Sequence, residues 1–502
     1  MVKEIEILDT TLRDGEQTSG VSFAVREKLS MARLLLDELH VNRIEIASAR
    51  VSEGEFESVR RIAQWAAARG YLDRVEVLGF VDNGVSLKWI ADAGCRVVNL
   101  LAKGSRRHCE LQLRKTPQQH FADIKTAIAQ ATEMGIAVNI YLEDWSNGIK
   151  HSPDYVFLVI DALKGLPICR FMLPDTLGVL NPGNTYEYCK MMVDRYPDLR
   201  FDFHAHNDYD LAVANVYSAI RAGIKGIHTT VNGLGERAGN APLSSVLAVI
   251  KDQLGEETSL REEKINKASR LVETYSGVHI PPNKPIIGEH VFTQCAGVHA
   301  DGDSKNNLYC NDLLPERFGR VREYALGKTS GKANIRKNLE ALGIDMDEGS
   351  MRKVTERIIE LGDKKEMVTP EDLPYIISDV LHHDNALEDQ KIRILNYSLS
   401  LAQGLKPVAT LKIEINGEAY EESASGDGQY DAFVRALRRI YSRLNRPFPM
   451  LTNYSVSIPP GGRTDAFVQT VISWNYAGVD FKTRGLDADQ TEAAIKATLK
   501  ML

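Results

Sequence analysis

The stretch EIEILDTTLRDGEQ, residues 4–17, joins a short run rich in β-branched residues to a cluster of charged residues that includes a glycine. Runs of the same kind recur about every 20 to 40 residues, separated by stretches in which apolar residues have helical spacing. Together with 4–10, they cover residues 43–48, 74–80, 96–102, 137–143, 170–176, 200–206 and 226–231. Eight strands alternating with helices over roughly 250 residues predict a closed α/β fold, the (β/α)8 TIM barrel, with a doubly wound open sheet as the alternative.

The periodicity changes twice after the predicted barrel. Four stretches with helical spacing come first, at 259–277, 330–343, 350–362 and 369–383. Runs typical of strands then return at 407–415, 452–460, 465–474 and 478–485, with helical stretches at 430–444 and 489–502. We therefore expect a barrel over 1–270, helical linker subdomains over 271–388 and a C-terminal α+β domain over 389–502.

The composition restricts the class of protein. The 502 residues are 43% hydrophobic and 26% charged, with a formal net charge of −7, which gives no basic field for nucleic acid. No segment has the basic and apolar regions of a signal peptide or the apolar length of a membrane span. The six cysteines form no Cys-x-x-Cys pair, which is typical of reduced thiols. The sequence predicts a cytoplasmic protein with neither a nucleic-acid nor a membrane partner.

In a TIM barrel the active site lies where the strands end, so polar residues at those positions are candidates. They are Arg13 and Asp14, Glu143 and Asp144, Asp175 and Thr176, and His204 and His206.

His204 and His206 point to the same side of their strand because side chains alternate along a strand. Only one strand separates the first from the seventh in a closed barrel, which lets Asp14 reach both rings. Two imidazoles and a carboxylate predict a divalent metal such as Zn, Mn or Mg, with positions left for substrate. The alternative is a pair of polar groups solvated in a loop.

Two glycine-rich stretches do not have nucleotide-binding spacing. In NGLGERAGN, residues 232–240, the third glycine is one position late for a dinucleotide fingerprint. In GKTSGKA, residues 327–333, the loop is too short for a phosphate loop. We expect the first stretch to shape the loop above the predicted metal site.

Several motifs together resemble one enzyme family. LRDGEQ (12–17) with Lys28, FHAHND (203–208) and NGLGERAGN are similar to the metal-dependent acyl-CoA condensing enzymes, namely the isopropylmalate, homocitrate and citramalate synthases. The resemblance covers essentially the whole chain. RIEIASARVSEGE (43–55), NIYLEDWSNG (139–148), GVHADGD (297–303) and LPERFGR (314–320) look most like the citramalate branch.

The resemblance implies a set of site residues. It adds Asn240 as a fourth metal ligand beside Asp14, His204 and His206, and it puts Arg13 next to the substrate carbonyl. It also implies that Glu143 and Thr176 lie near the substrate, with Thr176 bonded to the oxo-acid carboxylate.

The implied reaction joins acetyl-CoA to a 2-oxo acid. Leu78, Leu101 and Tyr141 match the positions that line the oxo-acid side chain in the family, and their bulk favours pyruvate and a product of (R)-citramalate. Plain packing of the barrel interior is the alternative for these three residues.

The resemblance also implies a homodimer. His299, Asp301 and Tyr309 match residues that reach the active site of the other subunit in relatives, and Asn307 and Leu308 are assigned to substrate binding. We predict that His299 acts with Glu143 in the proton transfers; the sequence leaves open which group removes the methyl proton.

The C-terminal domain resembles the allosteric and dimerisation domain of these synthases. Five of its residues match an isoleucine pocket: Tyr430, Asp431, Leu451, Tyr454 and Ile458. The resemblance therefore implies isoleucine biosynthesis and feedback inhibition by isoleucine. An ordinary α+β core with a dimer contact is the alternative.

Other functions remain open at this point. Isopropylmalate synthase and homocitrate synthase would use a larger oxo acid. An acyl-CoA lyase resembles enzymes with a cysteine in the loop after strand 8, which residues 232–240 lack. A biotin-dependent carboxyltransferase would need a carrier partner, and a ligand-sensing protein would need no intact metal site.

Overall fold

The structure of the chain is a computed structural model that describes residues 5–303, 308–363, 368, 370–381, 392–457 and 468–501. It contains two compact units. Unit 1 runs up to Phe292 and includes Cys310–Arg322, and unit 2 comprises Thr293–Tyr309 and the chain from Glu323 onward.

Unit 1 contains a closed barrel of eight parallel strands in sequence order. The strands are β1 (Glu6–Asp9), β2 (Arg43–Ser48), β3 (Val75–Phe80), β4 (Val97–Lys103), β5 (Ala137–Glu143), β6 (Ile168–Asp175), β7 (Phe201–Ala205) and β8 (Gly226–Thr229). All eight predicted strands are therefore confirmed, and the doubly wound alternative is wrong because β1 pairs with β8.

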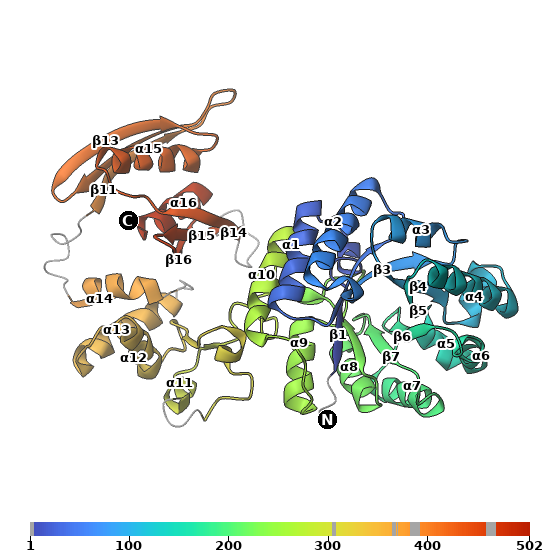
Figure 1. The fold of residues 1–502 in the computed structure, drawn as a ribbon. Helices are drawn as coiled ribbons and strands as arrows, with labels where there is room; N and C mark the ends of the chain where they lie inside the picture. Colours follow the sequence, from blue (N-terminus) through green and yellow to red (C-terminus); the bar gives the residue numbers. More distant parts are fainter. Residues whose placement is uncertain are drawn as a thin grey trace. The chain divides into compact units, whose positions relative to one another are not determined.

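Helices connect the strands and surround the barrel (Figure 1). They are α1 (Val25–Arg33), α2 (Glu53–Arg69), α3 (Val85–Asp92), α4 (Pro117–Glu133), α5 (Trp145–His151), α6 (Pro153–Leu163), α7 (Pro182–Arg195), α8 (Ala212–Arg221), α9 (Leu243–Ala248) and α10 (Ile265–Ser276). Local sequence sets their ends: Thr116 and Gln119 form a capping box at the start of α4, and Gly70 ends α2 in the left-handed region.

The floor of the barrel is charged. Arg43 on β2 donates hydrogen bonds to Glu76 on β3 at 2.8 Å and to Asp202 on β7 at 2.5 Å. Burial alone would raise the pKa of Asp202, but Arg43 outweighs it and holds that pKa well below its usual range. Ion pairs thus fill this end of the barrel, and the site lies at the other end.

Unit 2 begins with β9 (Thr293–Gln294) and β10 (Glu323–Tyr324), which pair in parallel. The helices of its first part are α11 (Gly297–Asp303), α12 (Lys332–Ala341), α13 (Glu348–Asp363) and α14 (Leu373–Leu381). The helices predicted at 330–343, 350–362 and 369–383 are therefore present; residues 369, 382 and 383 of the last prediction lie outside the described residues.

The C-terminal part of unit 2 has two antiparallel sheets of three strands, β11-β12-β13 and β14-β15-β16. Their elements are β11 (Ile392–Ser400), β12 (Val408–Ile415), β13 (Glu418–Ser425), α15 (Gln429–Arg443), β14 (Met450–Ser457), β15 (Val468–Tyr476), β16 (Val479–Asp487) and α16 (Gln490–Leu499). The sequence analysis missed β11 and β13. Both are edge strands. β13 is largely polar, and the apolar alternation of β11 is interrupted by a register shift between Ile394 and Asn396.

Two further expectations concern the whole chain. None of the six cysteines, all of which lie in the described residues, forms a disulfide. In the described ranges, no helix has both the length and the apolar composition that a membrane crossing requires.

Candidate active site

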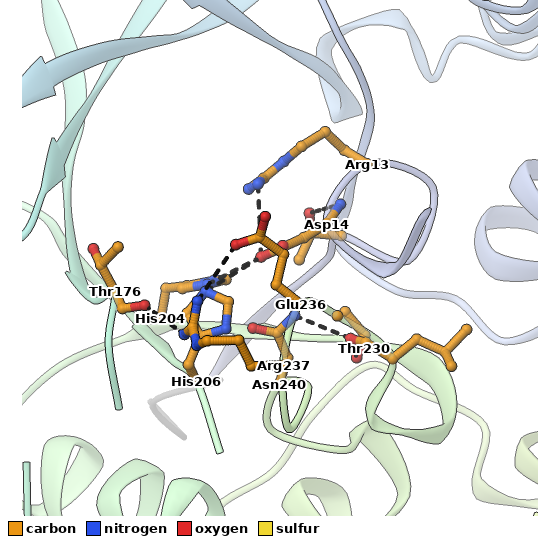
Figure 2. Close-up of polar contacts among 12 residues, drawn as sticks. Arg13, Asp14, Thr176, His204, His206, Thr230, Glu236, Arg237 and Asn240 are labelled. Carbon is orange, nitrogen blue, oxygen red and sulfur yellow. Dashed lines mark hydrogen bonds and ion pairs between the residues drawn. The ribbon is translucent and has the colours of Figure 1, made fainter. Parts of the chain in front are cut away.

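Three predicted metal ligands meet at the C-terminal mouth of the barrel (Figure 2). Asp14 lies in the loop after β1, His204 lies on β7 and His206 follows that strand. The Nε2 atoms of His204 and His206 lie 3.2 Å and 3.9 Å from Asp14 Oδ2. One ligand atom from each residue lies within 4.8 Å of the others, and all three residues are buried. The alternation along β7 and the closure of the barrel therefore bring the ligands together as predicted.

The protonation states of these groups suit a cation. Burial would raise the pKa of Asp14, but Arg13 and the two imidazoles outweigh it and hold that pKa well below its usual range. Burial and the neighbouring His204 lower the pKa of His206 to about 4. At neutral pH the cluster is one carboxylate with two neutral imidazoles, which is a donor set for a divalent metal.

Asn240 completes the cluster from the loop after β8. It forms an isolated bridge with His206, and its Nδ2 donates to the carbonyl of Leu234 at 3.0 Å. Its Oδ1 is buried and has no hydrogen-bond partner among the described residues. A buried oxygen left free beside the cluster is the feature that a fourth metal ligand requires, so the residues present fit a divalent ion.

The glycines of the 232–240 loop make this arrangement possible. Gly235 and Gly239 both have φ in the left-handed range, at 154° and 86°. A Cβ on Gly235 would lie 2.3 Å from Asn240 Nδ2, and one on Gly239 would lie 2.0 Å from the carbonyl oxygen of Gly233. The loop therefore needs glycine for close backbone approach, and it shapes the site as the sequence analysis expected.

Arg13 is held in place by Glu45 on the neighbouring strand β2. Glu45 on β2 accepts hydrogen bonds from Arg13 Nε and from Thr10, both at 2.7 Å, and from Asn99 at 2.8 Å. Arg13 Nη1 lies 3.6 Å from Asp14 Oδ2. The guanidinium is thus a fixed cation beside the metal ligands.

An apolar wall adjoins the cluster. Leu78 on β3, Leu101 on β4 and Tyr141 on β5 pack together with Leu8 and Met172 inside the barrel. The ring of Tyr141 lies 5.8 Å from that of His204, measured between centroids. The predicted pocket residues therefore form one surface next to the candidate metal site.

Two more predicted residues lie at the same mouth. Glu143 ends β5 and forms an ion pair with Lys103, which ends β4. Thr176 follows β6, and its hydroxyl oxygen accepts a hydrogen bond from the backbone amide of Asp144 at 2.9 Å. That hydroxyl keeps its own hydrogen for another acceptor.

Two other strand-end carboxylates hold the local structure. Asp144 accepts from Ser105 Oγ at 2.7 Å, and Asp175 accepts from the backbone amides of Val179 and Leu180, both at 3.0 Å. They stabilise the loops that carry the site.

A second group of predicted residues lies in unit 2. His299 and Asp301 belong to α11, and the rings of His299 and Tyr309 lie 4.4 Å apart. Leu308 and Tyr309 are exposed. Asn307 lies outside the described residues.

The predicted effector residues lie in the C-terminal part of unit 2. The rings of Tyr430 and Tyr454 lie 5.4 Å apart, and both pack with Leu451 around a small apolar cluster that includes Trp474. Asp431 forms an ion pair with Arg435 at 2.9 Å. Ile458 lies outside the described residues.

The sequence analysis missed Glu45, Lys103 and His228 as residues of the barrel mouth and interior. His228 on β8 is buried between His204, 5.4 Å away between ring centroids, and Asp202. Charged residues at alternate positions of an otherwise apolar strand, as Arg43 and Glu45 are, would have indicated inward-facing polar groups.

Family models match the chain in three consecutive segments. The HMGL-like model matches residues 4–272, and a model described as homocitrate synthase post-HMGL domain-like matches 286–366. The LeuA allosteric (dimerisation) domain matches 367–502.

Full-length relatives are also similar. A putative (R)-citramalate synthase of Methanopyrus kandleri is 35% identical over 92% of this chain and 88% of that protein. A probable 2-isopropylmalate synthase of the same organism is 34% identical over 100% and 98%. The (R)-citramalate synthase of Methanocaldococcus jannaschii is 33% identical over 99% and 98%.

Proposed function

The chain belongs to the HMGL-like family and is an acyltransferase-type enzyme of the citramalate and isopropylmalate synthase kind, and on this premise we propose that it condenses acetyl-CoA with pyruvate. The products are (R)-citramalate and free CoA. The observation that carries the choice of pyruvate is the wall of Leu78, Leu101 and Tyr141, which lies directly beside the cluster of Asp14, His204 and His206.

Asp14, His204, His206 and Asn240 are proposed to hold a divalent metal. Such an ion supplies a Lewis acid for the oxo-acid oxygens. Arg13, fixed by Glu45, opposes the negative charge that develops on the oxo oxygen as the carbon–carbon bond forms. Thr176 donates its hydroxyl hydrogen to the carboxylate of the oxo acid.

The apolar wall selects the oxo acid by size. Pyruvate presents a methyl group, whereas 2-oxoisovalerate presents a branched chain that the bulky side chains exclude. An apolar pocket separates substrates that differ by one methylene by only about 1 to 3 kcal/mol, so steric exclusion has to do the rest.

Glu143 is proposed to accept a proton from the methyl group of acetyl-CoA. The resulting carbanion equivalent attacks the oxo carbon, and water then cleaves the thioester to give citramalate and CoA. His299 of the partner subunit is proposed to assist the proton transfers in a homodimer. The LeuA dimerisation domain supports the dimer.

Turnover of three oxo acids tests the substrate. CoA release from acetyl-CoA is measured with pyruvate, 2-oxoisovalerate and 2-oxoglutarate, and each product is identified by mass. We expect the highest kcat/KM with pyruvate. A preference for 2-oxoisovalerate would make the protein an isopropylmalate synthase, which the 34% identical relative also supports.

A pocket variant with a matched control sharpens this test. Leu101→Ala should raise kcat/KM for 2-oxoisovalerate relative to pyruvate by at least about 10-fold, because a difference of one methylene already counts for roughly 10- to 200-fold and this substitution removes three carbons. Leu100 is the next residue on β4 and is buried on the opposite face. Leu100→Ala should lower stability without changing the ratio of the two substrates.

Isoleucine is the proposed effector. The cluster of Tyr430, Leu451 and Tyr454 is apolar, which suits contact with an aliphatic side chain. Millimolar isoleucine should lower activity, and Tyr454→Ala should abolish the inhibition while leaving kcat unchanged. Inhibition by leucine alone would contradict the assignment.

A further inference from the structure

Lys103 is a buried cation at the rim of the barrel. It is the last residue of β4 and lies in register with Glu143, the last residue of β5. The side chain of Lys103 is 8% exposed and that of Glu143 is 25% exposed, and the two form an ion pair.

The pair lies one layer above the apolar wall. Leu101 and Tyr141 occupy the preceding inward positions of the same two strands and are also in register. Side chains separated by two residues share a face of a strand. Lys103 and Glu143 therefore face the barrel mouth, where the oxo acid is proposed to bind.

The main chain of Lys103 is fixed on both sides. Its backbone amide donates to His120 Nε2 at 3.0 Å, and its carbonyl accepts from the Tyr155 hydroxyl at 3.1 Å. Burial lowers the pKa of His120 to about 4, so this ring is neutral and can accept the amide hydrogen.

The next residue fixes the rim further. The backbone amide of Gly104 donates to the carbonyl of Glu143 at 2.6 Å. A Cβ on Gly104 would lie 2.5 Å from the carbonyl oxygen of Leu142. Only glycine at position 104 allows the ends of β4 and β5 to approach this closely. This close approach determines where the Lys103 ammonium meets Glu143.

We propose that Lys103 is a positioning residue that fixes the Glu143 carboxylate for removal of the methyl proton of acetyl-CoA. This inference rests on the proposed function. One carboxylate oxygen takes the proton from carbon and becomes O–H, the C–H electron pair forms the new bond to the oxo carbon, and the other oxygen stays bonded to the Lys103 ammonium. Correct orientation of a base contributes to rate because only aligned geometries react.

Four variants test the proposal: Lys103→Met, Lys103→Arg, Glu143→Gln and the double variant Lys103→Met with Glu143→Gln. We expect Lys103→Met to lower kcat at least about 10-fold, and by no more than the roughly 10²- to 10⁴-fold that a positioned base contributes. The KM for pyruvate should change little. Lys103→Arg should restore part of kcat, and the double variant should be no slower than Glu143→Gln alone.

An isotope effect distinguishes positioning from a structural role. With trideuterated acetyl-CoA, the isotope effect on kcat should be larger in Lys103→Met than in wild type, because proton removal becomes more rate-limiting. Lys88→Met is the matched control, since the Lys88 side chain on α3 is 73% exposed and forms an ion pair with Asp92 at 2.6 Å. It should leave both kcat and the isotope effect unchanged.

Several outcomes would overturn the inference. These are a wild-type kcat in Lys103→Met, a loss that adds fully to that of Glu143→Gln, or a rise in KM alone, which would mean that Lys103 binds substrate. If Lys103→Met does not fold, Lys103→Gln removes the same charge and replaces it in the comparison with Lys103→Arg. A wild-type protein that releases no CoA with any of the oxo acids contradicts the proposed function instead.

Discussion

The pKa of a buried carboxyl group depends on the charged and hydrogen-bonding groups around it. Asp14 has Arg13 and two imidazoles around it, and their effect on its pKa exceeds that of burial. Asp9 on β1 has only Thr11 as a hydrogen-bonding neighbour, through the amide at 3.0 Å, and its Oδ2 is buried without a hydrogen-bond partner in the described part of the chain. Burial therefore raises the pKa of Asp9 to about 7.

Replacing a metal ligand should remove both metal and activity. His204→Ala should lower the bound metal per chain and reduce kcat/KM by more than the roughly 10- to 100-fold that follows loss of an outer-shell partner. Metal analysis and CoA release measure the two effects. His279→Ala is the control, because the His279 side chain is 92% exposed. Full metal content in His204→Ala would contradict the assigned ligand.

Asp9 should make stability depend on pH. Between about 4, near the pKa of an unfolded Asp, and the folded value of about 7, only the folded protein keeps the proton. The free energy of unfolding therefore decreases as pH rises through this range and stays low above it. Below about pH 4 the Asp9 side chain is protonated in both states, so it does not lower the free energy of unfolding there.

Asp9→Asn should remove that dependence, because an amide does not titrate and still accepts from Thr11. At pH 8 the variant should be more stable by a few kcal/mol, since each pKa unit corresponds to about 1.4 kcal/mol. Near pH 4 the difference should vanish. Urea unfolding at several pH values measures it, with exposed Asp198→Asn as control. A constant difference between pH 4 and pH 8 would be inconsistent with the argument.

Strands and helices place the site through close backbone contact at their ends. The loop after β4 lies against α5, where a Cβ on Gly148 would be 2.0 Å from the carbonyl oxygen of Gly104. The neighbouring atoms are backbone and cannot rotate away. The β4 rim that carries Lys103 therefore depends on α5.

Gly148→Ala should lower the stability of the protein and its kcat. The clash should lower the free energy of unfolding by about 1 to 3 kcal/mol, as overpacking does. Alanine stabilises a helix by roughly 1 kcal/mol relative to glycine, which offsets only part of this loss. Chemical denaturation and kcat measure the two effects. Gly165→Ala is the control, since a Cβ there meets nothing within 4 Å. Equal stability of the two variants would show that the contact yields easily.

The whole molecule combines two units with different tasks. Unit 1 contains the candidate metal ligands and the apolar wall, and unit 2 contains His299, Tyr309 and the predicted effector residues. The family models divide the chain in a similar order. If His299 serves the partner's barrel, activity depends on the dimer.

Mixing two inactive variants tests this arrangement. Asp14→Asn and His299→Ala subunits are unfolded together, refolded and assayed. If the site is shared, each hybrid dimer has one intact site, so random pairing should restore roughly a quarter of wild-type activity. Each variant refolded alone is the control. No recovery in the mixture would place His299 in the same subunit's site or outside the site.

The sequence by itself determined the eight strands, because β-branched runs and helical spacing are local properties of the chain. It also determined the cluster of Asp14, His204 and His206, because alternation along β7 and barrel closure are general rules. The edge strands β11 and β13 were missed because an irregularity interrupts the alternation of β11 and because β13 is largely polar.

Only the tertiary structure decided which charges meet. Glu45 holds Arg13, and Lys103 meets Glu143. Asn240 donates its amide to Leu234, and its Oδ1 has no hydrogen-bond partner among the described residues. These contacts depend on strand register and on glycine positions where backbones approach closely. The two ion pairs, Arg13 with Glu45 and Lys103 with Glu143, join residues far apart in the chain. No local sequence pattern encodes the distance between them.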